Sequence, residues 1–173
     1  MVRISDLEEY KQRSAEEISA EITQNIESYI ETFNDAFSSA FQKYQTQQEE
    51  DLKTELKHVY ICYLRSSITE NLPFFRIDLY DKADIEDLKE CSADWSVLFS
   101  KTLYEAIPPT DGTTIIDEKY GILSEELWFK ESELFFQALK SYMPEIIAKS
   151  RQGVSPDVQW HYGEYLDLCT EIL

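Results

Sequence analysis

Residues 18–44 read ISAEITQNIESYIETFNDAFSSAFQKY and carry the strongest periodicity in the chain. The apolar residues of this stretch recur at steps of three and four: Ile18, Ile22, Ile26, Tyr29, Ile30, Phe33, Ala36, Phe37, Ala40, Phe41 and Tyr44. At 100° per residue they fall within an arc of about 140°, and acidic side chains occupy the opposite side. The pattern predicts an amphipathic helix that packs against a core, because the stripe is wider than a two-stranded coiled-coil seam.

The predicted helix is long for a single domain. Neither Gly nor Pro occurs in residues 1–72, so a helix from residue 5 to 46 would extend about 60 Å. A compact domain of this size is only about 40 Å across. We therefore expect the helix to end in the Gln-rich segment 44–51, with a homodimer through a projecting N-terminal helix as the alternative.

Two short runs that follow this stretch have the composition of strands. Residues 59–64 and 74–80 are rich in β-branched and aromatic side chains. In the second run Phe75, Ile77 and Leu79 alternate with more polar residues, which is the period of a half-buried strand. These runs predict a small two-stranded antiparallel element.

The rest of the chain carries helix signals. Ser92, Ser124 and Ser155 each precede apolar residues at helical spacing, as N-cap residues do. Pro144 should kink or stop the second of these helices, and the third should reach Cys169. The expected fold class is mainly α (α+β), with a long N-terminal amphipathic helix, one two-stranded antiparallel element and three or more C-terminal helices.

Composition restricts the partners of this chain. Its 173 residues include 34 acidic and 16 basic ones, for a net charge of −18. We expect one acidic, helix-rich domain over residues 1–173, with residues 1–52 as an N-terminal helical subregion. This charge repels phosphate backbones and anionic lipids, so we expect no direct nucleic-acid binding and no membrane binding. A basic protein partner is electrostatically favoured.

Localisation follows from the absence of targeting signals. The chain has no apolar run of 18 residues, and its first residues lack the basic-then-apolar pattern of a signal peptide. We therefore expect a cytoplasmic protein whose three cysteines are reduced.

Motifs for catalysis are missing from the sequence. The four glycines never cluster into a phosphate-binding loop, and His58 and His161 stand too far apart for an HExxH motif. No serine lies in a GxSxG motif. We therefore predict no catalytic, cofactor-binding or metal-ligating residues and no enzyme activity. The alternative is an enzyme with a carboxylate-based site, with or without a divalent metal.

Two segments are candidates for partner contact. The first is the acidic stretch 78–90, from which we select Asp81, Asp84, Glu86 and Asp87; a solvated surface and a divalent-cation site are the alternatives. The second is the aromatic cluster of Trp160 and Tyr162 around His161, which resembles an exposed interface hot spot, with core packing as the alternative. The predicted function is a non-enzymatic protein-binding module, inhibitor-like or adaptor-like, for a basic partner.

Two arginines flank the loop between the predicted strands. Arg65 and Arg76 could face Asp78 or Glu70. A surface ion pair worth less than about 1 kcal/mol is the first interpretation, and an anion-binding pair in a pocket is the second.

Overall fold

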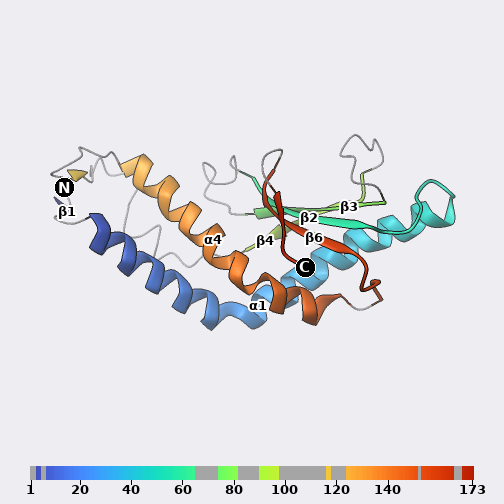
Figure 1. Cartoon of the computed structure of the whole chain (residues 1–173), viewed down its shortest axis with the longest axis horizontal. Helices are drawn as coiled ribbons and strands as arrows, with labels where there is room; N and C mark the ends of the chain where they lie inside the picture. The colour runs from blue at the N-terminus through green and yellow to red at the C-terminus, as the bar shows by residue number, and fades with distance from the viewer. Residues whose placement is uncertain are drawn as a thin grey trace. The chain divides into compact units, whose positions relative to one another are not determined.

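The computed structural model describes most of the chain. The described residues are 3–4, 7–64, 74–81, 90–97, 116–117, 124–151, 153–165 and 169–173. In chain order the elements are β1 (Arg3–Ile4), α1 (Leu7–Glu49), β2 (His58–Tyr63), β3 (Phe74–Tyr80), β4 (Ser92–Ser96), β5 (Ile116–Asp117), α4 (Ser124–Ser150), β6 (Gln159–Glu164) and β7 (Cys169–Glu171) (Figure 1).

The chain divides into two compact units, each built from two segments that are distant in sequence. The first unit contains Met1–Asn25 and Leu98–Ser141, and the second contains Ile26–Val97 and Tyr142–Leu173. Both α1 and α4 contribute residues to each unit. The chain therefore crosses between the units within α1 and within α4.

In the first unit, short strands accompany the helices. Strand β1 pairs in parallel with β5, and Arg3 lies opposite Ile116. Helix α1 buries Ile18 and Ile22 here, and the described part of α4 in this unit buries Phe135, Phe136 and Leu139. The apolar stripe of α1 thus begins to bury its side chains in this unit.

The second unit contains a mixed five-stranded sheet with the strand order β4-β3-β2-β6-β7. Strands β2, β3 and β4 form an antiparallel meander, and β6 and β7 form a second antiparallel pair. Strand β2 joins the two parts by pairing in parallel with β6, which places Ile61 between Ile77 and Tyr162.

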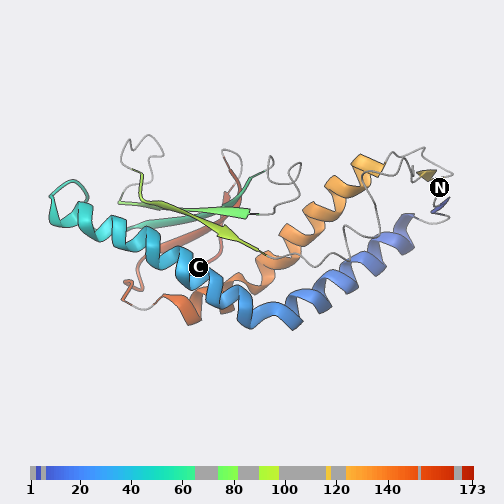
Figure 2. The same ribbon diagram turned by 180° about the vertical axis from the view of Figure 1, so that it is seen from behind.

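Helix α1 supplies one layer of the core of the second unit, along one face of the sheet (Figure 2). Phe33 is fully buried and meets Trp95 edge to face, with ring centroids 5.0 Å apart. Phe37 packs on Trp160 at 5.3 Å. The indole N–H of Trp95 donates a hydrogen bond of 3.0 Å to Thr32 Oγ1. These contacts explain the amphipathic period, since the apolar side of α1 lies against aromatic side chains of the sheet.

The predicted fold class is wrong about the sheet and the later helices. The sheet has five strands instead of two, and the described residues hold two helices, α1 and α4. The helix expected after Ser92 is strand β4, because Ser92, Asp94 and Ser96 alternate with residues that include the buried Trp95 and Val97. The alternation of buried and exposed side chains decides the structure of this segment, and the N-cap signal of Ser92 does not.

The helix expected after Ser155 is absent for a similar reason. The Ser155 hydroxyl accepts a hydrogen bond of 3.3 Å from the Asp157 N–H, but it caps only a turn. Beyond this turn Val158, Trp160 and Tyr162 are buried at every second position, as the inner residues of a strand are. The segment therefore joins the sheet as β6, and Cys169 lies in β7.

Helix α4 continues through Pro144, so of the two expected effects of this residue, a kink or a stop, the stop is wrong. The proline is exposed, whereas Met143, Ile146 and Ile147 are fully buried. Burial of these apolar side chains offsets the backbone hydrogen bond that the proline cannot donate.

Helix α1 ends at Glu49, inside the segment where the sequence predicts its end, but its 43 residues are not the shorter helix expected for one compact domain, because α1 contributes to both units. Beyond it, Asp51 has a left-handed backbone with φ of 56°. The Asp51 N–H donates to the Gln48 carbonyl at 3.1 Å, and the Leu52 N–H donates to the Gln47 carbonyl at 2.9 Å. This is the hydrogen-bond pattern of a helix C-terminus whose left-handed residue is usually glycine.

We expect Asp51→Gly to raise the free energy of unfolding by about 1 kcal/mol, because glycine adopts positive φ without steric cost. Asp51→Asn is the matched control, since it removes only the negative charge beside the helix C-terminus. Urea denaturation of both variants measures the difference. Equal stability of the Gly and Asn variants would show that the backbone of Asp51 costs nothing.

Candidate binding site

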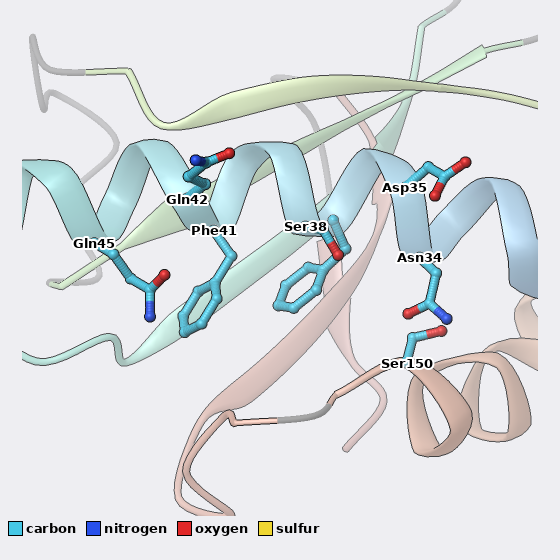
Figure 3. A pocket seen from close by; sticks show the side chains of 8 residues that line it. Asn34, Asp35, Ser38, Phe41, Gln42, Gln45 and Ser150 are labelled. Atoms are coloured by element: carbon cyan, nitrogen blue, oxygen red, sulfur yellow. The ribbon is translucent and has the colours of Figure 1, made fainter.

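A pocket of about 600 Å³ lies along α1 in the second unit (Figure 3). Asn34, Ser38, Phe41 and Gln45 line it at steps of three and four, so the helix presents them on one side. Ser150, the last residue of α4, lies at the end of the pocket next to Asn34. The two helices together form a polar groove, which we call the α1 groove.

The α1 groove has an acceptor-rich lining with one formal charge. Asp35 supplies a carboxylate, Asn34, Gln42 and Gln45 supply carboxamides, and Ser38 supplies a hydroxyl. Among the described residues that line it there is no Lys, Arg or His. The groove therefore favours a cationic ligand over an anionic one.

Two phenyl rings form the apolar part of the groove. Phe37 and Phe41 stack with centroids 5.7 Å apart and an interplanar angle of 13°. Phe37 is buried against Trp160, whereas Phe41 is only partly buried. The ring of Phe41 is thus held in place on one side and accessible elsewhere.

Ser150 contributes a buried hydroxyl to the groove. The residue is 4% exposed, and its Oγ has no hydrogen-bond partner within the described residues. An unsatisfied buried polar group costs about 1–3 kcal/mol.

Carboxylates extend from the groove along α1. Glu31 and Asp35 are exposed and one helical turn apart, and neither has an ion-pair partner among the described residues. Glu27 is different, because Lys149 contacts it at 3.0 Å and also contacts Glu145 at 3.1 Å. The hydrogen bond to Glu27 raises the pKa of Lys149. Lys149 is therefore already paired with two carboxylates.

The other face of the sheet carries polar side chains, beginning with a buried ion pair. Arg76 Nε contacts both carboxylate oxygens of Asp78, at 3.0 and 3.1 Å, and Arg76 Nη2 lies 3.1 Å from Glu90. Asp78 is buried, so the expected surface pair is a buried one. Burial raises the pKa of Asp78, and Arg76 opposes this rise. Because Arg76 already has two carboxylate partners, the anion-binding interpretation loses its support; Arg65 and Glu70 lie outside the described residues.

The two histidines of the chain meet on this face. His58 Nδ1 lies 3.2 Å from His161 Nε2, and His161 stacks on Tyr60 with centroids 4.4 Å apart. Burial lowers the pKa of His161, and the neighbouring His58 adds to this effect, while Glu171 opposes it. A hydrogen bond between the rings requires an unprotonated nitrogen on one of them.

We expect acidification through the unfolded histidine pKa of about 6.5 to destabilise the fold at this pair. The folded pKa of His161 is lower, so the unfolded state takes up the proton first and stability falls as pH decreases. The His161→Gln variant should lose less stability between pH 7.5 and 5.5 than the wild type. Urea denaturation at both pH values measures this, and equal losses would contradict the assignment.

Two thiols also approach each other on this face. Cys62 Sγ lies 3.3 Å from Cys169 Sγ, and both residues pair with Gly163 on the strand between them. Two strand spacings separate their Cα atoms by roughly 9–10 Å, beyond the reach of a disulfide. The hydrogen bond between the thiols and burial raise the pKa of Cys62. All three cysteines are free, and the Cys62 thiol is expected to be unreactive.

The aromatic residues predicted for partner contact are not on the surface. Trp160 is 1% exposed and Tyr162 is 3% exposed, and they pack on Phe37 and Phe75 respectively. The core-packing alternative therefore describes both residues. Between them on β6, His161 points to the polar face and is partly buried.

Asp81 is the one acidic site residue that the structure describes. Its Oδ2 accepts hydrogen bonds of 2.9 Å from the N–H and the hydroxyl of Thr54. Burial acts to raise the pKa of Asp81, but the hydrogen bonds from Thr54 lower it below its usual value. This carboxylate thus fastens the α1–β2 connection to the end of β3. Asp84, Glu86 and Asp87 lie outside the described residues, and their role in partner contact stays a prediction.

Sequence reasoning missed the α1 groove. Asn34, Ser38 and Gln45 border the apolar stripe of α1, and their spacing could have identified a polar strip beside the core face. Nothing in the sequence brings Ser150 to this strip. In the described part of the chain, no three His, Cys, Asp or Glu residues gather to hold a metal ion.

Comparisons of the whole chain with known proteins found no match. No protein-family model matches the chain, and neither curated proteins nor solved structures give a significant match. Within the described residues, no helix combines the length and the apolar character needed to span a membrane.

Proposed function

We propose that this protein is a non-enzymatic binding module that takes a basic segment of a protein partner into the α1 groove. The observation that carries the proposal is the lining of this groove, which contains a carboxylate, two phenyl rings and several oxygen acceptors without a cation. A ligand with positive charge and N–H donors complements such a surface.

The charges around the groove support the same partner. Glu31 and Asp35 are exposed on one side of α1, and the whole chain has a net charge of −18. Such a field attracts a basic protein over a distance and accelerates association at low ionic strength. The same field disfavours nucleic acid, whose phosphates would meet carboxylates.

The proposal places the protein in the cytoplasm, which fits its three free cysteines. We also propose that the protein does not bind membranes, because its negative charge repels anionic lipid headgroups.

A fluorescent peptide of twelve residues that alternates Gly with Lys or Arg tests the proposal by anisotropy titration. The Glu31→Gln/Asp35→Asn variant should bind this peptide about tenfold more weakly at low salt, since two carboxylates beside the ligand are lost. The Glu49→Gln/Glu50→Gln variant removes the same charge from exposed positions at the end of α1, outside the groove lining, and serves as the matched control.

The proposal predicts that the control binds like the wild type within about twofold, apart from a small uniform charge effect. Equal weakening in both variants would show that the peptide responds only to net charge and would contradict binding in the groove. Failure of the wild type to bind at low salt would contradict the function itself.

A further inference from the structure

We infer that His58 and His161 form a two-histidine site for one Zn²⁺ ion on the polar face of the sheet. The sequence predicts no metal-ligating residue, because these two histidines stand 103 positions apart. The parallel pairing of β2 with β6 brings them together (Figure 1). This site is separate from the α1 groove, so the inference does not depend on the proposed function.

The distance between the two imidazoles suits neighbouring ligands of one tetrahedral ion. His58 Nδ1 lies 3.2 Å from His161 Nε2. Zinc binds histidine nitrogen at about 2.0–2.1 Å, so two nitrogens at tetrahedral corners lie about 3.3–3.4 Å apart. The observed separation is within about 0.2 Å of this range, which is the tolerance of a metal site. The two nitrogens can therefore share one ion without a shift of the strands.

A tyrosine between the histidines holds both rings in position. His161 stacks on Tyr60 with centroids 4.4 Å apart and an interplanar angle of 12°. The ring of His58 lies 6.3 Å from the same tyrosine. Tyr60 in turn meets Tyr80 edge to face at 5.6 Å. Because both imidazoles are ordered before an ion binds, binding costs little further side-chain entropy.

The surroundings of the pair admit a cation and attract it. Both histidines are only partly buried, so solvent reaches them. Glu171 is exposed and lies opposite His161 on β7, with its carboxylate 3.4 Å from Gln159 Nε2. The whole chain has a net charge of −18. Such a negative field raises the local concentration of cations.

The donor atoms select a transition-metal ion over the harder cations. Imidazole nitrogen suits zinc, whereas Mg²⁺ and Ca²⁺ prefer oxygen ligands. The described residues contain no group of three His, Cys, Asp or Glu side chains that could hold an ion, so water completes the coordination in this site.

The ion replaces the hydrogen bond between the two rings. In the neutral pair, one of the facing nitrogens carries a hydrogen and the other accepts it. Zinc needs a lone pair from both nitrogens, so this hydrogen leaves to solvent and the outer nitrogen of the same ring takes one up. Both imidazoles remain neutral, and the ion links β2 to β6.

Isothermal titration calorimetry of the whole protein with Zn²⁺ at pH 7.5 tests the inference, with excess Mg²⁺ to occupy carboxylates that bind cations without selectivity. We expect one Zn²⁺ per chain. His58→Gln and His161→Gln each remove one ligand, and each should weaken zinc binding about tenfold or more. Circular dichroism melts verify that the variants are folded.

Two control variants address the other groups that bind zinc. Glu49→Gln/Glu50→Gln removes two exposed carboxylates at the end of α1, away from the histidines. Cys169→Ser removes a thiol from β7, the strand beside β6. Both should keep the wild-type zinc affinity within about twofold.

Nuclear magnetic resonance of the wild type identifies the ligands without any variant. The chain has only two histidines, so their Cε1–H and Cδ2–H signals account for all of its imidazoles. Zn²⁺ should shift the signals of both rings with one common midpoint, whereas Mg²⁺ alone should shift neither set.

The outcomes separate the inference from its alternatives. One Zn²⁺ that shifts both imidazoles and is weakened by either histidine substitution supports it. Unchanged binding in one or both histidine variants, a loss in Cys169→Ser, or absence of zinc binding in excess Mg²⁺ overturns it. Binding of a basic segment in the α1 groove is decided by its own peptide titration, whichever zinc result is obtained.

Discussion

Phe33→Ala is expected to lower the free energy of unfolding by about 3–5 kcal/mol. Phe33 is fully buried, lies 5.0 Å from Trp95 edge to face, and stacks near Phe37 at 6.1 Å. Truncation removes a whole ring from the layer between α1 and the sheet, and fixed neighbours on both sides prevent the cavity from collapsing. Chemical denaturation monitored by tryptophan fluorescence measures the loss.

Glu31→Ala is the matched control, because this residue is exposed on the same helix and should change stability by less than about 0.5 kcal/mol. A loss below about 1 kcal/mol for Phe33→Ala would contradict the core position of this face. Sedimentation of the wild type in the same buffer tests the homodimer through the N-terminal helix, which stays a prediction.

Arg76→Ala is expected to cost about 3–5 kcal/mol at neutral pH, because it leaves the buried carboxylate of Asp78 without its cation. Both oxygens of Asp78 contact Arg76 Nε, and Asp78 is 4% exposed. Burial already raises the pKa of Asp78. Loss of Arg76 should raise it further, so acidification should protonate the carboxyl and reduce the penalty.

The double variant Arg76→Ala/Asp78→Asn should regain much of this loss, since it removes the unpaired charge together with its partner. Glu90→Gln serves as the control. Its side chain is exposed beside Arg76, and its contribution should stay below about 1 kcal/mol. If Arg76→Ala cost the same at pH 7.5 and pH 5, the charge of Asp78 would not be the cause.

The sequence is most informative where a single period extends over many residues. Eleven apolar positions from Ile18 to Tyr44 support the prediction of α1, and the helix is present. It ends at Glu49, within the Gln-rich segment that has no apolar residue after Tyr44 until Leu52. The pairing of β2 with β3 was also predicted, because the two runs are neighbours in sequence and one of them alternates. Long or local signals therefore suffice for these elements.

The errors occur where a short strand follows a residue typical of helix N-caps. Ser92 and Ser155 each precede only a few alternating residues, and those residues also match a helical spacing over one turn. Whether Trp95 and Trp160 occupy strands depends on β3 and β2, the strands beside them. That information is tertiary, so the period of these segments alone could not decide the structure.

The candidate site depends on distant residues in the same way. The spacing of Asn34, Ser38 and Gln45 on one side of α1 is predictable from helical geometry. The position of Ser150 beside them depends on the course of α4, and it gives the groove its buried acceptor. The buried state of Trp160 likewise follows from the position of β6 between β2 and β7, which no local pattern reveals.

The parallel pairing of β2 with β6 has a consequence for synthesis of the chain. During translation β2, β3 and β4 leave the ribosome before residues 159–164 are made. The backbone groups of β2 that pair with β6 in the folded protein are unpaired during this interval. Phe37 of α1, which packs on Trp160 in the folded protein, also lacks this contact during that interval. A chain whose synthesis stops in α4 would therefore keep this β2 edge unpaired and open to association with other chains.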